Sequence, residues 1–292
     1  MTRRQAVGWL ILVCLVWGVS FTVIKETLAL VSPLMLMGLR FGLASLLLIG
    51  SFRALSRYEV LGGVVLGLLF WAGFAFQTFG LDGTTPSRSA FITSLSTPLV
   101  PVVYYLVYRR APHLLTIAGV LLAGIGMYLL TLPDAGSGGL NRGDLLTLGC
   151  AVMFAAQIVA AGHFSRRGGP MRLLAVELAT AGTLSLLLAP VLETPRVTPT
   201  PWFAAALIFL TLSGLWSFYM QLRAQQVLSP SHTALLFMLE PVFAALTSFV
   251  VLGERLGPLQ WAGAALILAA MALPALERSV LPATASPKDS LT

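Results

Sequence analysis

Apolar runs of about 20 residues recur along this chain, and they restrict it to one broad class of structure. Each run is long enough to cross about 30 Å of hydrocarbon as an α-helix. The runs are continuously apolar and do not alternate, which favours helices over the strands of a barrel. We place ten spans, at 6–28, 34–52, 60–81, 86–108, 113–132, 144–164, 171–192, 202–223, 230–252 and 257–276. The sequence therefore predicts an all-α polytopic membrane protein.

The charged residues are few and they alternate between loops. Hydrophobic residues make up 57% of the chain and charged residues 10%, whereas a soluble domain carries about 25% charged residues. With a cytoplasmic N-terminus, the inner loops and ends hold most of the lysines and arginines. The positive-inside rule then predicts an inner (plasma) membrane protein with both termini in the cytoplasm. The net charge of +7 is thus a topology signal and does not indicate a nucleic-acid partner.

The second half of the chain repeats the first. The aligned pairs are Trp17 with Phe154 and Arg40 with Glu177 at an offset of 137, Phe74 with Phe218 and Gln77 with Gln221 at 144, and Pro98 with Pro241 at 143. Each half has five spans, an odd number, so the second half must enter the membrane from the opposite face. Inverted repeats are a recurring plan of secondary transporters, whose substrate sites lie near mid-bilayer between the repeats. We predict one repeat at 1–136, a second at 137–276 and a disordered cytoplasmic tail at 277–292.

Three stretches resemble the EamA-type members of the drug/metabolite transporter superfamily. They are CLVWGVSFTVIK (14–25), GLRFGL (38–43) and SHTALLFMLEPVFAALTSFVVLGERLGPLQWAGAALIL (231–268). The resemblance covers nearly the whole chain and implies two five-helix repeats around a central cavity, with export of small metabolites. The YddG-type amino-acid exporters are the nearest subgroup it suggests. The first repeat departs from the pattern, because SLSTPLVPVVYYLVYRRAP (94–112) has no glutamate before its first proline, so a role for Glu240 cannot be duplicated there.

Aromatic and amide side chains near mid-span are candidates for a cavity wall. Trp17 and Trp71 lie near the middle of their spans and Trp216 somewhat past it, where an indole N–H needs a buried partner or water. Either these rings pack helices together, or they line an aromatic cavity that Phe74, Phe91, Phe154, Phe237 and Tyr219 could join. Gln157 also lies near mid-span, whereas Gln77 and Gln221 lie near span ends and are expected at the membrane interface.

Prolines free backbone carbonyls deep in two spans. Pro98 and Pro241 leave the carbonyls of Ser94 and Phe237 without their helical donors. Such backbone is tolerated at depth only where it faces protein or a water-filled cavity. Two interpretations stay open: neighbouring hydroxyls satisfy a kink, or the prolines are gating hinges and the carbonyls contact substrate.

Three ionisable residues lie inside the predicted spans. Glu240 is about ten residues past Pro230, roughly 15 Å into the bilayer, where hydrocarbon disfavours an unpaired charge. It could couple protons, accept a substrate ammonium or bond to a neighbouring helix. Arg40 and Glu177 could both snorkel in structural roles. Otherwise Arg40 could gate or couple transport, or hold a substrate carboxylate bidentately.

These features predict a secondary transporter that exports small organic metabolites by alternating access. Neutral, aromatic or apolar amino acids are the favoured substrates, and other amphiphilic metabolites or drugs are the alternative. A channel or structural subunit is less favoured, and so is an enzyme, because the chain has no HExxH or GxSxG motif. Neither of its two lysines lies in a phosphate-binding loop, so no ATPase engine is evident. We expect no cofactor and no metal, and the expected partners are a small-molecule substrate and lipid.

Overall fold

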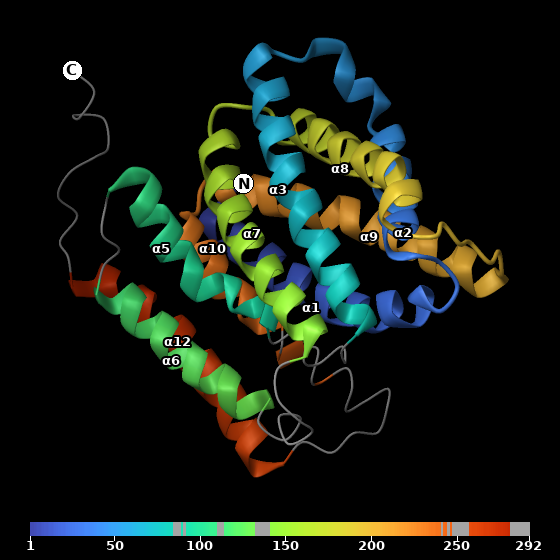
Figure 1. Cartoon of the computed structure of the whole chain (residues 1–292). Helices are drawn as coiled ribbons and strands as arrows, with labels where there is room; N and C mark the ends of the chain where they lie inside the picture. The colour runs from blue at the N-terminus through green and yellow to red at the C-terminus, as the bar shows by residue number, and fades with distance from the viewer. Residues whose placement is uncertain are drawn as a thin grey trace.

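In the computed structural model, helices fall on the predicted spans wherever the chain is described (Figure 1). The structure describes residues 1–83, 89, 92–109, 114–131, 141–240, 242–243, 246 and 257–280. The helices are α1 (Arg3–Leu28), α2 (Pro33–Leu47), α3 (Arg57–Asp82), α5 (Ser96–Tyr108), α6 (Leu114–Thr131), α7 (Arg142–Phe164), α8 (Pro170–Leu192), α9 (Pro201–Gln225), α10 (Pro230–Phe237) and α12 (Pro258–Val280), with the 3-10 helix η1 (Ile49–Ala54) after α2. The predicted all-α class is therefore confirmed.

The long helices present apolar side chains to their surroundings. By length and composition α1, α3, α7, α8 and α9 can each cross a bilayer, and α2 and residues 92–108 form shorter apolar helices. Leu61, Leu187 and Ile208 are each at least 60% exposed on such helices. Large exposed apolar surfaces are unfavourable in water, so in this protein they face lipid. These features confirm a polytopic membrane protein.

The helix starts repeat between the two halves of the chain. Capping boxes begin the first helix of each half, with Thr2 and Gln5 at α1 and Asn141 and Asp144 at α7. Proline occupies the first turn of α2 and of α8, where its missing N–H leaves no helical bond unmade. The local signals that start the helices are therefore duplicated along with the spans.

Helix α2 is shorter than the span predicted at 34–52. It ends at Leu47, and η1 continues the chain to Ala54. Gly50 and Ser51 favour a helix less than the leucines before them, so the apolar run continues past the point where the α-helix ends.

Close contacts between α2 and α8 show that the halves are inverted. The side chain of Leu186 packs against Gly38, and a Cβ added to Gly182 would lie 2.7 Å from the backbone nitrogen of Gly42. As α2 advances from Gly38 to Gly42, its contacts on α8 move backwards, so the two helices are antiparallel. Because α2 and α8 are the second spans of their halves, the inverted arrangement is confirmed.

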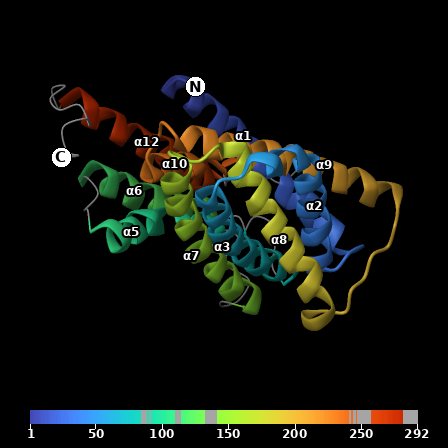
Figure 2. The same ribbon diagram turned by 90° about the horizontal axis from the view of Figure 1, so that it is seen from above.

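The helix contacts between the two halves also come in equivalent pairs, as the inverted arrangement requires. Helix α1 packs on α9. The equivalent contact is that of α7 with α3, because α7 corresponds to α1 and α3 corresponds to α9. Helices α5 and α10 contact each other, as do α6 and α12. Figures 1 and 2 show α6 and α12 at one edge of the molecule, away from α2 and α8. The remaining helices surround the centre.

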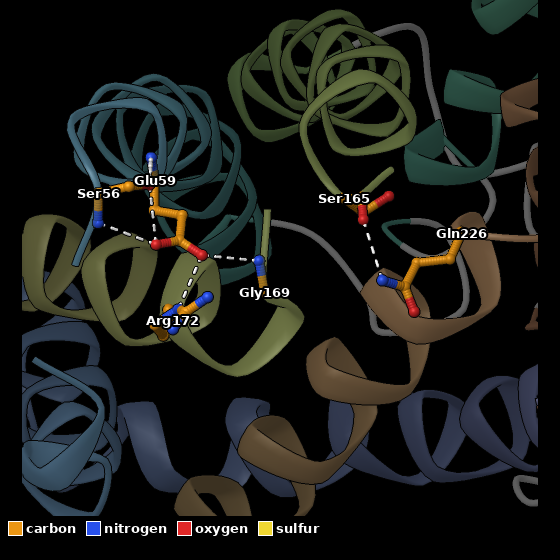
Figure 3. Close-up of polar contacts among 6 residues, drawn as sticks. All are labelled: Ser56, Glu59, Ser165, Gly169, Arg172 and Gln226. Carbon is orange, nitrogen blue, oxygen red and sulfur yellow. Dashed lines mark hydrogen bonds and ion pairs between the residues drawn. The ribbon is translucent and has the colours of Figure 1, made fainter. Parts of the chain in front are cut away.

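Each half carries a carboxylate that binds the start of the other half's second span. Glu59, in the first turn of α3, accepts hydrogen bonds from the Gly169 N–H at 2.8 Å and the Arg172 Nε at 2.7 Å, beside α8 (Figure 3). Glu193, just after α8, accepts hydrogen bonds from the backbone N–H groups of Leu34 at 3.0 Å and Met35 at 3.1 Å, at the start of α2. The two contacts lie at opposite ends of α8: the Glu59 contact joins α8 to α3, and the Glu193 contact joins α8 to α2.

A second contact lies beside the Glu59 site. The Gln226 side chain, just after α9, donates a hydrogen bond of 3.1 Å to the Ser165 carbonyl at the end of α7 (Figure 3). Helices α7 and α9 are thereby joined at the same end of the molecule at which Glu59 joins α3 to α8.

Candidate binding cavity

A central cavity lies between the two halves. Counting its opening to solvent, it encloses about 840 Å³. Its walls come from α1, α2, α3, the 92–97 region, α7, α9 and the segment around α10. The lining residues are Trp17, Ser20, Phe21, Ile24, Arg40, Phe41, Phe70, Phe74, Gln77, Thr93, Ser94, Ser96, Thr97, Phe154, Gln157, Ile158, Leu210, Ser213, Gly214, Phe218, Gln221, Phe237 and Glu240.

Aromatic rings form much of the wall, and they follow the repeat. Trp17 contacts Phe218 with ring centroids 5.5 Å apart, and the equivalent pair, Phe154 and Phe74, is 5.0 Å apart. Phe74 and Phe218, which correspond to each other, meet at 5.8 Å. The pseudo-two-fold axis between the halves therefore passes through this aromatic cluster, at the cavity.

Further rings extend the cluster into both halves. Phe70 lies 4.6 Å from both Phe74 and Phe218, and Phe41 lies 4.9 Å from Phe70. Phe237 lies 4.9 Å from Trp17. Edge-on and tilted contacts of this kind hold rings in fixed orientations, so the wall offers an ordered apolar surface to a solute.

Both halves break a helix beside the cavity. Leu95 and Met238, which are repeat equivalents, interrupt the helices with nearly the same backbone angles, φ −62° and ψ −13° against φ −64° and ψ −11°. Each lies three residues before a proline of the repeat, Pro98 or Pro241. Pro98 lies in the first turn of α5, next to the lining residue Thr97, and Pro241 lies outside the described residues, as does Phe91.

The hydroxyl groups near the first break are partly committed to the protein. Thr97 donates a hydrogen bond of 3.1 Å to the Ala234 carbonyl of α10 and so joins the two broken segments. Ser94 and Thr93 line the cavity beside it, and the Gln77 amide donates a hydrogen bond of 3.3 Å to the Thr93 hydroxyl. The break thus brings hydroxyl groups to the cavity wall.

A chain of buried side chains connects the cavity to α8. The Gln221 amide donates to the Gln157 carbonyl oxygen at 3.0 Å, and the Gln157 amide donates to the Glu177 carboxylate at 2.8 Å. Gln77 and Gln221 are 5% and 3% exposed and line the cavity, so their expected place at the membrane interface is wrong. The reason is that the cavity extends along α3 and α9 towards their ends at Asp82 and Gln225.

Two ionisable side chains line the cavity. Arg40 is buried on α2, with its guanidinium carbon 4.3 Å from the ring centre of Phe41 and 4.8 Å from that of Phe74. Glu240 is buried and lies after the break at Met238. Neither forms an ion pair with the part of the chain that the structure describes. Snorkelling does not describe Arg40 or Glu177, because both are buried among helices.

The structure brings together most of the predicted contact residues. Trp17, Phe74, Ser94, Gln157, Phe237 and Glu240 line the cavity, as does Phe154. Trp71, Trp216 and Tyr219 lie outside its lining. The Trp71 ring is half-buried beside the core cluster of α2, α3 and α8, Trp216 packs against Trp9 at 6.0 Å, and Tyr219 lies below Arg223 at 6.0 Å.

Several lining residues were not predicted from the sequence. They include Ser20, Phe21, Ile24, Phe41, Phe70, Ser213 and Phe218. A helical spacing connects many of them to predicted ones, because Ser20, Phe21 and Ile24 continue the face of Trp17, and Phe70 and Gln77 continue that of Phe74. Extending each candidate along its helix face would have found these residues.

The arrangement suits the binding of an amphiphilic solute. Aromatic rings, hydroxyl groups and amides surround a space with one lining arginine and one lining glutamate among the described residues. Pockets of this size, mostly apolar with a few placed polar groups, are typical of small-molecule sites.

Comparisons with known proteins connect this fold to a family. The model of the EamA-like transporter family matches twice, at residues 4–132 and 141–275. An uncharacterized transporter of Archaeoglobus fulgidus is 35% identical over 267 residues, which cover 91% of this chain and 84% of that relative. The uncharacterized inner membrane transporter YedA of Escherichia coli K12 is 25% identical over 288 residues, 94% of this chain and 92% of YedA.

A solved crystal structure shares the fold. It superposes with a TM-score of 0.78 and 21% sequence identity, covering 96% of this chain and all of the other. The uncharacterized transporter YyaM of Bacillus subtilis is 24% identical over 268 residues, 86% of this chain and 87% of YyaM.

Proposed function

Because this chain belongs to the EamA-like transporter family, a family of membrane transporters, we propose that it exports neutral amino acids, aromatic and apolar ones included, by alternating access. The functional unit is the pair of repeats 1–136 and 137–276, and 277–292 is a tail outside it, whose first residues continue α12 to Val280. The membrane that we propose is the inner (plasma) membrane, which the name of the relative YedA supports. The loop charges support a cytoplasmic location of both termini.

The central cavity carries this proposal. Eight aromatic side chains line it, and its lining arginine and glutamate balance each other in formal charge. A neutral solute with an apolar side chain suits such a wall, whereas sugars need more hydrogen-bonding groups and phosphates more fixed positive charge. The substrate contacts that we propose are Trp17, Phe74, Ser94, Gln157, Phe237 and Glu240.

Two features support alternating access. The two halves are inverted relative to each other about an axis at the cavity. Equivalent helices of the two halves therefore run in opposite directions across the membrane. The breaks at Leu95 and Met238 give each half one place where a helix can bend, with Pro98 and Pro241 as the hinge residues that we propose.

Counterflow in liposomes tests the proposal. Vesicles that contain the protein are loaded with excess unlabelled phenylalanine and diluted into a trace of labelled phenylalanine. A carrier transiently accumulates label above its equilibrium level, and a simple pore does not. Uptake no greater than that of protein-free vesicles, across a panel of neutral amino acids, would contradict the amino-acid proposal.

A further inference from the structure

Arg40 and Glu177 hold equivalent positions in the two repeats, but within the described chain only Glu177 has a hydrogen-bond partner for its charged group. Both side chains are buried, at 4% and 0% exposure, and both lie on the second span of their half. A buried charge is normally paired or hydrogen-bonded, because leaving it alone costs a large desolvation free energy. The difference between the two positions therefore needs an explanation.

In the second repeat the protein satisfies the acidic group itself. Glu177 accepts the Gln157 amide at 2.8 Å, and Gln221 in turn donates to Gln157 at 3.0 Å. Three helices, α7, α8 and α9, contribute one residue each. Although the second carboxylate oxygen has no partner among the described residues, the carboxylate is held by a chain of donors.

In the first repeat the corresponding positions do not serve Arg40. Ser20 corresponds to Gln157, and its hydroxyl donates to the Val16 carbonyl of its own helix at 2.8 Å. Gln77 corresponds to Gln221, and its amide donates to Thr93 at 3.3 Å. The Nε and Nη2 atoms of Arg40 are buried and have no hydrogen-bond partner in the part of the chain that the structure describes.

The surroundings of Arg40 form a built site and not an accidental gap. The Phe41 and Phe74 rings lie near the guanidinium. These rings stabilise the cation but accept no hydrogen bond from its N–H groups. A guanidinium is planar and presents a fork of donors that a carboxylate can accept in two parallel bonds. Arg40 lines the cavity, so a solute in the cavity can supply that carboxylate.

We propose that Arg40 is the anchor for the carboxylate of the transported solute and thereby sets the substrate class. This assignment rests on the proposed transport function and deepens it. A monoanionic carboxylate with an aromatic or apolar body fits one guanidinium among rings. The matching amine without a carboxylate leaves the guanidinium unpaired and is rejected.

Binding to the purified full chain in detergent tests this proposal. The probes are 3-phenylpropanoate, phenylalanine, phenethylamine and phenyl phosphate, with affinity measured by calorimetry and by the shift in melting temperature. Charge-assisted hydrogen bonds predict that 3-phenylpropanoate and phenylalanine bind about 10-fold or more tighter than phenethylamine. We expect Arg40→Gln to lose about 10-fold or more for both carboxylates, and Arg40→Lys to lose less. Phenyl phosphate binds more weakly than 3-phenylpropanoate if the site is built for a monoanion.

A matched control and a stability readout separate binding from packing. Arg223→Gln removes an arginine near the end of α9, outside the cavity lining, and leaves all four affinities unchanged. Without ligand, Arg40→Gln keeps or raises the melting temperature, because it removes an unsatisfied buried charge. A purely structural arginine predicts a lower melting temperature and unchanged carboxylate binding, and that pair of results overturns the proposal.

Other results are equally decisive. Phenethylamine binding as tightly as 3-phenylpropanoate, tighter binding of phenyl phosphate, or no binding of either carboxylate overturns the anchor. If 3-phenylpropanoate binds through Arg40 but no amino acid shows counterflow, the anchor stands and the proposed amino-acid transport fails. If phenylalanine counterflow is the same in Arg40→Gln as in the wild type, transport stands and the anchor fails.

Discussion

Glu240 differs in its surroundings from three other carboxylates, the buried Glu59 and Glu177 and the partly exposed Glu193. Glu59, Glu177 and Glu193 all accept hydrogen bonds from side chains or backbone of the protein. Glu240 lines the cavity, and in the described chain it has no hydrogen bond or ion pair that would give it a structural role. Of the three roles that the sequence allows, acceptance of a substrate ammonium and proton coupling fit these surroundings better than a structural bond.

Glu240→Gln should therefore impair transport without unfolding the protein. Glutamine keeps the size of the side chain but neither takes a full negative charge nor exchanges a proton. We expect phenylalanine counterflow to fall about 10-fold or more, as for loss of a charged hydrogen bond, with the melting temperature unchanged or higher. Glu26→Gln, at an exposed carboxylate of α1, is the control. Equal rates in Glu240→Gln and wild type from about pH 5 to 8 would exclude both roles.

Single residues also show where sequence reasoning fails. Depth along a span placed Trp17 and Gln157 correctly, because an indole N–H or an amide near mid-span is costly without a polar partner. It failed for Gln77 and Gln221, because the cavity extends along α3 and α9 towards their ends. Depth also cannot tell which side of a helix faces the cavity, and so it does not separate Trp17 from Trp71.

At the scale of helices, the carboxylates of Glu59 and Glu193 join the two repeats. Each binds the first turn of the other repeat's second span, where free N–H groups favour an anion. Apolar packing between helices is nondirectional, whereas these directional contacts fix the register of α8 against α3, through Glu59, and against α2, through Glu193.

Glu59→Gln should destabilise the protein. A neutral amide cannot accept all of the hydrogen bonds from Ser56, Gly169 and Arg172, and it leaves donors near the start of α8 unsatisfied. The expected loss is about 1–3 kcal/mol, or roughly 2–10 °C in melting temperature in detergent. A double-mutant cycle with Arg172→Gln measures the part due to the ion pair. An unchanged melting temperature in Glu59→Gln would mean that the contact does not hold the repeats together.

The helix break before Pro98 makes a different prediction. Pro98→Ala restores a backbone N–H that can bond towards the Ser94 carbonyl and stiffen the helix. We expect an unchanged or slightly higher melting temperature and a several-fold slower counterflow. Pro190→Ala, at a proline inside α8 and outside the cavity lining, tests for a general effect of removing a helix proline. Faster or equal transport in Pro98→Ala would argue against a hinge at this point.

The spans themselves were predictable because continuous apolar runs of bilayer length leave few alternatives. The early end of α2 was not, since Leu46, Leu47 and Ile49 continue the apolar run while the backbone changes to a 3-10 turn. Hydropathy reports the environment of a residue, and it reports backbone hydrogen bonding only indirectly.

For the whole molecule, the odd number of spans in each half predicts inversion, and the antiparallel contact of α2 with α8 confirms it. The existence of a cavity between the halves follows from the same plan. Its shape and most of its lining could not be predicted, because they depend on how each helix is rotated about its axis. Those rotations are set by contacts such as that of Gly38 with Leu186, between segments far apart in the sequence.

The central claim is that both faces of the membrane reach one cavity in turn, and that substrate occupies it. Ser213→Cys, on the cavity wall, can be studied after the two buried cysteines are removed by Cys14→Ala and Cys150→Ala. A membrane-impermeant thiol reagent is then applied to one face of oriented vesicles at a time, with and without phenylalanine. We predict labelling from both faces and slower labelling when phenylalanine is present, while Leu187→Cys, exposed to lipid, shows no protection. Labelling from one face only, or from neither, would contradict a shared cavity with alternating access.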